Sequence, residues 1–196
     1  MDTNQITGLI LAGGRGTRMG TVDKGLQTLH DTPLVSHVID RLAPQVGPML
    51  LNANQNQDVY AQFGIHVIAD SLQGFAGPLA GVQAGLEHCK TEFMATVPCD
   101  SPYFPDNLVS TLYQALNERE ADLAVAVTGE GEQRQQHPVF CLLRRSLLPH
   151  LNNYLREGNR KFALWYASLL VVEVHFEDEH AFLNINTLDE LRQQNQ

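Results

Sequence analysis

The chain has 196 residues, of which 43% are hydrophobic and 18% are charged, and its formal net charge at pH 7 is −9. This length and composition indicate one globular domain, and the negative charge argues against broad, non-specific binding of nucleic acid. No apolar run is long enough to cross a bilayer, and the first residues do not resemble a signal peptide. We therefore expect a cytoplasmic protein that does not act at a membrane.

Apolar runs rich in β-forming residues alternate with amphipathic segments along the whole chain. The predicted strands are Ile6–Leu11, Met49–Asn52, His66–Ala69, Phe93–Val97, Leu123–Val127, Val139–Leu142 and Leu170–Val174. The predicted helices are Leu34–Leu42, Leu79–His88, Asp106–Asn117, Arg145–Leu155, Lys161–Ala167 and Leu188–Gln194, the last with a capping box of Thr187 and Glu190. This alternation predicts an α/β fold with a doubly wound, mostly parallel sheet and helices on both faces.

The first predicted strand ends in a glycine-rich loop, LAGGRGTRMG. It does not match the dinucleotide fingerprint, because Met19 stands where the third glycine belongs, and no lysine follows a glycine as in ATPase phosphate loops. Glycines allow a sharp turn whose N–H groups can bind an anion, and nearby cations add charge. The alternative is an ordinary turn with solvated arginines. The residues predicted to cradle phosphates are Gly13, Gly14, Arg15, Gly16, Arg18 and Lys24.

This loop and the DKG that follows it resemble the signature of nucleotidyltransferases, and most of all that of the molybdenum cofactor guanylyltransferases. Similar stretches run along nearly the whole chain: LNAN, IADSLQGFAGPLAG, VPCDSPYFP, HPV, EGNRKF and LNINTLDEL. The resemblance implies a Rossmann-like nucleotidyltransferase fold in a single domain over residues 1–196. The N-terminal half would mainly bind GTP and the C-terminal half mainly a pterin.

Three polar residues end or follow predicted strands: Asn52, Asp70 and Asp100. From the residues alone, each can be a turn or cap residue, and Asp100 can cap a helix that begins near Pro105. The resemblance implies that Asn52 and Asp70 bind the guanine nucleotide and that Asp100 binds Mg²⁺, a cation that prefers oxygen ligands. The nucleotide-binding residues implied are Leu11, Ala12, Gly13, Gly14, Arg15, Gly16, Lys24, Asn52, Asp70 and Asp100.

Further polar and glycine positions lie in the GPLAG, EGNRKF and NIN stretches. Alone, they can be a helix start with Pro78 in its first turn, a solvated basic turn and structural caps. The resemblance implies that they contact the pterin substrate. The pterin-binding residues implied are Gly77, Gly81, Arg160, Lys161, Asn184 and Asn186.

The resemblance implies that the terminal phosphate of molybdopterin attacks the α-phosphorus of GTP and that pyrophosphate leaves. Lys24, Asp100 and Arg18 are the implied catalytic residues, with Mg²⁺ as cofactor. The implied partners are GTP, molybdopterin or Mo-molybdopterin, molybdenum-insertion proteins and acceptor molybdoenzymes, and we expect a monomer. Charge neutralisation and alignment of two anions would carry most of the catalysis.

Four residues with reactive side chains are expected to have no part in the chemistry. Cys89, Cys99 and Cys141 form no CxxC pair, so we expect buried thiols rather than a zinc site or disulfides. His137 precedes a proline and resembles a general base. A phosphate nucleophile is already ionised at neutral pH, however, so we expect His137 to have a structural or substrate-orienting role.

Three other functions remain open at this stage. The first is a molybdopterin cytidylyltransferase that uses CTP, although LAGG resembles the guanylyl branch more than the alanine-rich cytidylyl one. The second is a sugar-1-phosphate nucleotidyltransferase, for which the chain is short. The third is a carrier that binds a pterin without catalysis, which would have no need of Asp100 and Lys24.

Overall fold

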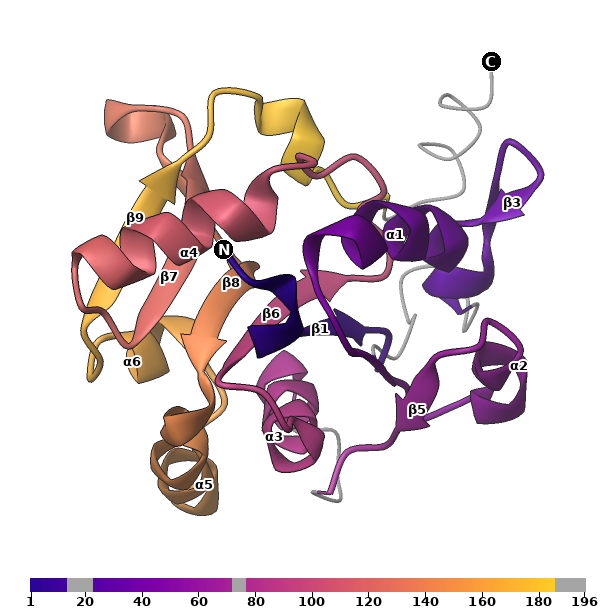
Figure 1. Cartoon of the computed structure of the whole chain (residues 1–196), viewed down its shortest axis with the longest axis horizontal. Coiled ribbons are helices and arrows are strands. Elements are labelled where there is room, and N and C mark those ends of the chain that lie inside the picture. Colours follow the sequence, from indigo (N-terminus) through magenta and orange to yellow (C-terminus); the bar gives the residue numbers. More distant parts are fainter. Residues whose placement is uncertain (14–22, 72–76, 186–196) are drawn as a thin grey trace.

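The computed structural model, which describes residues 1–13, 23–71 and 77–185, is built on a seven-stranded sheet (Figure 1). The strand order is β5-β4-β1-β6-β8-β7-β9, and β8 runs antiparallel to both of its neighbours while the other pairs are parallel. The strands are β1 (Ile6–Leu11), β4 (Met49–Asn52), β5 (His66–Ile68), β6 (Phe93–Pro98), β7 (Leu123–Thr128), β8 (Gln135–Arg144) and β9 (Val171–His175). The predicted mostly parallel sheet is confirmed.

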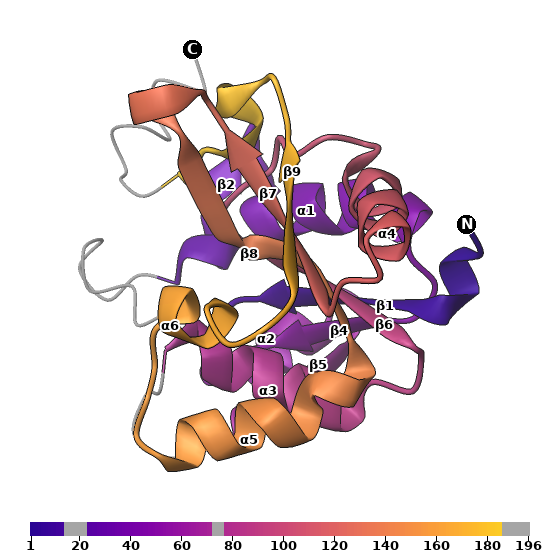
Figure 2. The same ribbon diagram turned by 90° about the vertical axis from the view of Figure 1, so that its left-hand side faces the viewer.

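Helices cover both faces of the sheet, as expected. Figure 2 shows α1 and α4 on one face and α3 and α5 on the other. The helices are α1 (Leu34–Leu42), α2 (Gln57–Ala61), α3 (Pro78–His88), α4 (Leu108–Glu118), α5 (Leu148–Arg156) and α6 (Phe162–Tyr166). Every helix within the described residues is too short or too polar to span a lipid bilayer.

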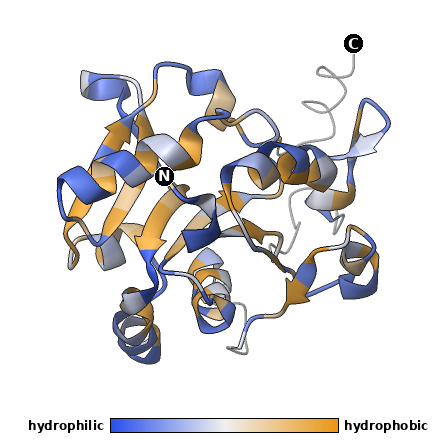
Figure 3. Cartoon of the chain, in the orientation of Figure 1, coloured by the Kyte–Doolittle hydropathy of each residue, from blue (hydrophilic) through white to orange (hydrophobic). Residues whose placement is uncertain are grey.

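The central strand β1 explains why the sheet needs two helical layers. All six of its residues are buried, and successive side chains of a strand point to opposite faces. Ile6 and Ile10 belong to the core that includes residues of α1 and α4, whereas Leu9 and Leu11 belong to the core that includes residues of α3 and α5. Figure 3 shows the sheet as mostly hydrophobic and the outer helix surfaces as largely hydrophilic.

The carboxyl ends of the parallel strands bring the polar segments of the sequence to one edge of the sheet. β1, β4 and β6 end at Leu11, Asn52 and Pro98, which are cross-strand partners. Strand β8 is antiparallel to β7, so the first residues of β8, from Gln135, pair with the last residues of β7. Ligands of open α/β sheets bind beyond this edge.

Most predicted elements are present, and the differences are local. Strand β5 ends at Ile68, one residue early, α4 begins at Leu108 rather than Asp106, and β8 is longer than predicted. A hairpin of β2 (Thr28–Leu29) and β3 (Thr32–Pro33) and the short helix α2 were not predicted. The predicted helix Leu188–Gln194, with Thr187 and Glu190, lies outside the described residues.

Candidate active site

Lys24 and Asp100 form an ion pair at the carboxyl edge of the sheet. Lys24 Nζ lies 3.1 Å from Asp100 Oδ2, and only 8% of the Asp100 side chain is exposed. Asp100 follows β6 after Cys99, whose N–H donates to Leu11 O, so the loop continues the register of β1 and β6. The alternative in which Asp100 caps the following helix is wrong, because the N-cap residue of α4 is Asn107.

The turn that carries Lys24 is fixed on both sides. Asp23, which precedes it, accepts hydrogen bonds from Tyr60 Oη at 2.5 Å and from Asn56 Nδ2 at 3.0 Å. Gly25, which follows it, is buried so closely that an added Cβ would lie 2.6 Å from Tyr60 Oη. Lys24 itself begins a short 3₁₀ turn, Lys24–Leu26.

Asn52 and Asp70 meet at the ends of β4 and β5, which are neighbouring parallel strands. Asn52 Nδ2 donates to Asp70 Oδ1 at 2.9 Å. Asn54 Nδ2 donates to the other oxygen, Oδ2, at 2.9 Å, and Asn54 Oδ1 accepts from the Asp70 N–H. Both carboxylate oxygens of Asp70 are therefore held, and the group is oriented before any ligand arrives.

Two glycines leave room for the buried Asn52 side chain. An added Cβ on Gly13 would lie 2.9 Å from Asn52 Oδ1, and one on Gly81 would lie 2.4 Å from the same atom. Gly81 is buried inside α3, so the structure gives it a packing role beside Asn52 and Leu11. Gly77 lies at the exposed N-cap of α3 with φ of +74°, a backbone conformation that favours glycine.

The segment that contains Asn184 lies directly against the Asp100 loop. The fully buried Ser101 hydroxyl donates to Asn184 Oδ1 at 2.8 Å, and the Ile185 N–H donates to Asp100 O at 2.8 Å. The sequence prediction placed Asn184 near the second substrate, and the structure brings it next to the Lys24–Asp100 pair.

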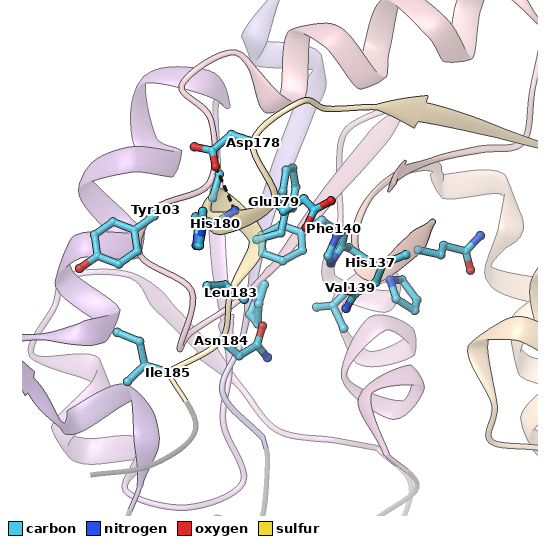
Figure 4. Close-up of a pocket in the computed structure, with 16 residues that line it drawn as sticks. Tyr103, His137, Val139, Phe140, Asp178, Glu179, His180, Leu183, Asn184 and Ile185 are labelled. Carbon is cyan, nitrogen blue, oxygen red and sulfur yellow. Dashed lines mark hydrogen bonds between the residues drawn. The ribbon is translucent and has the colours of Figure 1, made fainter. Parts of the chain in front are cut away.

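Beside this loop opens a cleft of about 1300 Å³ (Figure 4). In the figure Tyr103 lies on one side of the cleft and His137 and Val139 on the other, with Leu183 and Asn184 between them. The other lining residues are Pro98, Gln135, Gln136, Pro138, Phe140, Asp178, Glu179, His180, Ala181, Phe182 and Ile185. The lining residues include the carboxylates of Asp178 and Glu179 and no lysine or arginine, so the cleft suits a planar group that offers N–H donors at its edges.

His137 is part of the wall of this cleft. It stacks on Phe182, with ring centroids 4.8 Å apart, and shares a 2.8 Å hydrogen bond between Nε2 and the Thr128 hydroxyl. Burial lowers the pKa of His137, and the negative charge of Glu179 opposes this effect. The neutral, packed imidazole agrees with the predicted structural or orienting role.

The three cysteines are free and buried, as expected. Burial, followed by the neighbouring charge of Asp100, raises the pKa of Cys99 well above its ordinary value. Burial also raises the pKa of Cys141. Both groups therefore stay as neutral thiols, and neither has the thiolate character that nucleophilic chemistry requires.

The basic turn of EGNRKF joins α5 to α6. Arg160 donates to the main-chain oxygens of Leu155 and Asn159 and so caps the end of α5. Lys161 is exposed at the N-cap of α6, and its main-chain oxygen accepts from Tyr154 Oη. The structure gives Arg160 a structural role, and contact of either residue with a substrate stays a prediction.

Several predicted residues cannot be placed. Gly14, Arg15, Gly16, Arg18 and Asn186 lie outside the described residues. Conversely, sequence reasoning missed Asn54, Asp23 and Tyr60. Asn54 stands two residues after Asn52 in LNAN, which is a usable signal, whereas the contact between Tyr60 and Asp23 spans 37 positions and has no local signal.

The donor set at Asp100 fits a hard divalent cation. Among the described residues, no group of three or more His, Cys, Asp or Glu is arranged to hold a metal. A single carboxylate of this kind suits an ion such as Mg²⁺, which keeps several waters and takes further ligands from substrate phosphates.

Comparison with known proteins identifies the family. Residues 8–169 match the MobA-like NTP transferase domain. The chain is 55% identical to a molybdenum cofactor guanylyltransferase of Cupriavidus necator over 96% of both chains. It is 53% identical to one of Ralstonia pickettii over 97% of this chain and 96% of that one.

A solved structure agrees with this at the level of the fold. Molybdopterin-guanine dinucleotide biosynthesis protein A from Archaeoglobus fulgidus superimposes with a TM-score of 0.79, at 22% identity and over 96% of each chain. With the fold, the carboxyl-edge site and the matched sequence in agreement, the chain belongs to the MobA-like NTP transferases, and within them to the molybdenum cofactor guanylyltransferases.

Proposed function

We propose that this enzyme transfers GMP from GTP to the terminal phosphate of molybdopterin, forming the guanine dinucleotide cofactor and pyrophosphate. The observation that carries the proposal is the Lys24–Asp100 pair at the carboxyl edge of the sheet, between the Asn52–Asp70 network and the cleft. At this edge a carboxylate can bind a cation, and an ammonium group can bind a phosphate. The similar proteins of Cupriavidus necator and Ralstonia pickettii are named molybdenum cofactor guanylyltransferases, which agrees with this activity.

The nucleotide would lie along the ends of β1, β4 and β6. Asp70, oriented by Asn52 and Asn54, presents a carboxylate acceptor that suits the N–H donors of guanine or the hydroxyl groups of ribose. The main chain of Leu11, Ala12 and Gly13, with Gly14, Arg15, Gly16 and Arg18, would hold the triphosphate. A base that leaves such a fixed acceptor unpaired binds less well, which is the basis of discrimination.

Asp100 would hold Mg²⁺, and Lys24 would neutralise charge near the α-phosphate. When bound, the metal screens the repulsion between the attacking phosphate and GTP. The nucleophile needs no general base, so the protein's part is to align two anions and to compensate their charge. Lys24 can do so because its ammonium already lies at the reaction edge, 3.1 Å from Asp100 Oδ2.

The cleft beside Asn184 is the proposed place of the pterin ring. Its walls combine apolar and aromatic side chains with the amides of Gln135, Gln136 and Asn184 and the carboxylates of Asp178 and Glu179, which can form hydrogen bonds with the ring. Gly77, Gly81, Arg160, Lys161 and Asn186 remain proposed contacts of this substrate. The proposal also keeps a division into a GTP-binding N-terminal half and a pterin-binding C-terminal half.

We propose a cytoplasmic monomer that receives molybdopterin or Mo-molybdopterin and passes its product to acceptor molybdoenzymes, with molybdenum-insertion proteins as further partners.

The decisive experiment incubates the purified protein with molybdopterin, Mg²⁺ and one nucleotide at a time. We expect pyrophosphate release and a pterin dinucleotide with GTP, and little of either with CTP, ATP or UTP. A sugar 1-phosphate in place of molybdopterin serves as the matched control. Equal turnover with CTP would replace this proposal by the cytidylyl one, and pterin binding without pyrophosphate release would replace it by a carrier.

A further inference from the structure

The turn that carries Lys24 is held by a side chain from another element. Tyr60, in α2, is fully buried, and its hydroxyl reaches back 37 positions to the carboxylate of Asp23. We infer that Tyr60 is a positioning residue of the transfer reaction: it fixes Asp23, and through Asp23 it fixes the direction from which Lys24 enters the site.

The hydrogen bond between Tyr60 and Asp23 is short and has a fixed direction. Tyr60 Oη lies 2.5 Å from Asp23 Oδ1, within the range of hydrogen bonds to a charged acceptor. Burial, followed by the negative groups around it, raises the pKa of Tyr60 far above its ordinary value. The hydroxyl therefore stays protonated and can act only as a donor towards this carboxylate.

The Asp23 side chain does not bond to the 3₁₀ turn that follows it. Asp23 is the N-cap of Lys24–Leu26, yet its side chain makes no capping hydrogen bond. Its two oxygens are taken instead by Tyr60 and by Asn56 Nδ2, at 3.0 Å. The carboxylate thus ties the turn to the segment around α2 rather than stabilising the turn itself.

Gly25, on the other side of Lys24, packs closely against the Tyr60 hydroxyl. An added Cβ on Gly25 would lie 2.6 Å from Tyr60 Oη and 3.2 Å from Cys99 Sγ. Cys99 in turn precedes Asp100, the partner of Lys24. Tyr60 therefore touches both neighbours of Lys24 in sequence, and a shift of its ring would move the turn relative to Asp100.

This arrangement matters for rate more than for affinity. A catalytic cation misplaced by about 1 Å can cost about 100-fold in rate. The hydrogen bonds that hold the proposed nucleotide contacts Asn52 and Asp70 do not include Asp23, Lys24 or Gly25. The inference rests on the proposed role of Lys24. The test must therefore distinguish failure of the positioning role of Tyr60 from failure of the proposed GMP transfer.

The test uses Tyr60→Phe, which removes one oxygen and keeps the buried ring. We expect kcat for GMP transfer to fall about tenfold, with the KM for GTP changed less than about twofold. Tyr113→Phe, on α4 and packed against Phe93, is the matched control and should keep both constants. An unchanged kcat in Tyr60→Phe would overturn the inference.

A double-mutant cycle shows whether Tyr60 acts through Lys24. Lys24→Ala alone should lower kcat by about 100-fold while GTP binding, measured by calorimetry, weakens far less. Adding Tyr60→Phe to Lys24→Ala should then change kcat by less than about twofold. A further tenfold loss in the double variant would overturn the inference, because Tyr60 would be acting by another route.

Hydrogen exchange gives a readout that does not need activity. The Leu26 and Gln27 N–H groups donate to Asp23 O and Lys24 O within the turn. In Tyr60→Phe these two amides should exchange at least about tenfold faster, while the amides of β1 stay protected. Unchanged exchange overturns the positioning inference alone. Faster exchange in a protein that transfers no GMP overturns only the proposed function.

Discussion

Asp100 makes two contacts that separate its proposed chemistry from its role in the fold. Its side chain pairs with Lys24, whereas its main-chain oxygen accepts from the Ile185 N–H. Only the first contact is lost when the carboxylate is removed. A substitution at this position therefore tests the proposed metal site without removing the hydrogen bond that docks residues 184–185.

Asp100→Ala is expected to lower metal-dependent turnover by about 100-fold or more, because the proposed Mg²⁺ site loses its carboxylate. The thermal midpoint should stay close to that of the natural chain. Turnover measured across a Mg²⁺ titration checks the first expectation, and calorimetric unfolding checks the second. Near-normal activity at saturating Mg²⁺ would remove Asp100 from the metal site.

Asn54→Ala should weaken GTP binding about tenfold, because Asp70 loses two hydrogen bonds and with them its fixed orientation. Isothermal calorimetry measures the effect. Asn117→Ala, which removes a single side-chain bond on α4, is the control and should leave GTP affinity unchanged. Equal affinities in the two variants would show that Asp70 does not need its asparagine partner.

How far single residues could be predicted depended on where their partners lie. Asp100, Asp70 and Asn52 end or follow strands, and parallel strands bring such residues to a common edge. Tyr60 could not be assigned in this way, because it lies in a five-residue helix and its partner Asp23 belongs to a distant loop. Arg160 donates to the main-chain oxygen of Leu155 near the end of α5, and its contact with a substrate stays a prediction.

Among the elements, α3 combines packing with proximity to the site. Its glycines Gly81 and Gly85 lie one turn apart and both face the sheet. An added Cβ on Gly85 would lie 2.5 Å from Leu9 Cδ2, whereas one on Gly81 would lie 2.4 Å from Asn52 Oδ1. The same substitution at the two positions therefore separates crowding of the core from crowding of the nucleotide network.

Gly81→Ala and Gly85→Ala should each destabilise the protein by about 1–3 kcal/mol, because both overfill a closely packed contact. GTP affinity should fall only in Gly81→Ala, since that methyl group displaces Asn52 from Asp70. Denaturant unfolding and calorimetric titration of both variants provide the two measurements. Normal GTP affinity in Gly81→Ala would contradict a role of Asn52 in nucleotide binding.

Elements with a strong local pattern were predicted to the residue, and those without one were missed. Strand β1 is continuously apolar and α1 has a clear helical period, and their bounds agree with the prediction. The hairpin of β2 and β3 turns through His30 and Asp31, both with positive φ, and lacks the usual glycine.

The full length of β8 was not predicted, because its N-terminal part lacks the apolar pattern of a strand. Its first residues are polar and it contains Pro138, which cannot donate to a sheet. The register between β7 and β8 shifts between Val125 and Ala126, so that Val125 pairs with Cys141 and Ala126 with His137. Pro138 falls within this bulge, where no ladder bond is required of it.

For the whole molecule, the reversed strand β8 decides where the cleft opens. An all-parallel sheet would carry the start of this strand to the opposite edge. The antiparallel direction instead brings His137 to the edge where β6 leads into Asp100. The wall of the cleft and the Lys24–Asp100 pair thus come together through topology rather than through nearness in sequence.

The stability of the whole protein should depend on the protonation of His137. Burial lowers the pKa of this residue below its ordinary value of 6.5, so the unfolded chain binds the proton more readily than the folded one. This contribution to stability is therefore present above that value and is lost as the pH falls below it. We expect the thermal midpoint to drop more steeply from pH 7 to pH 5.5 in the natural chain than in His137→Gln.

The matched control for this measurement is the exposed His175→Gln. It should show the same steep dependence as the natural chain. A His137→Gln variant with an unaltered pH slope would mean that other groups cause the acid loss of stability.

The contact of Ser101 with Asn184 spans 83 positions and has a consequence for how the protein is made. A nascent chain that ends just before Asn184 already contains all seven strands of the sheet. It still lacks Asn184 and Ile185, which form hydrogen bonds with Ser101 and Asp100. The hydrogen bonds that dock residues 184–185 on the Asp100 loop can therefore form only after every strand of the seven-stranded sheet has been synthesised.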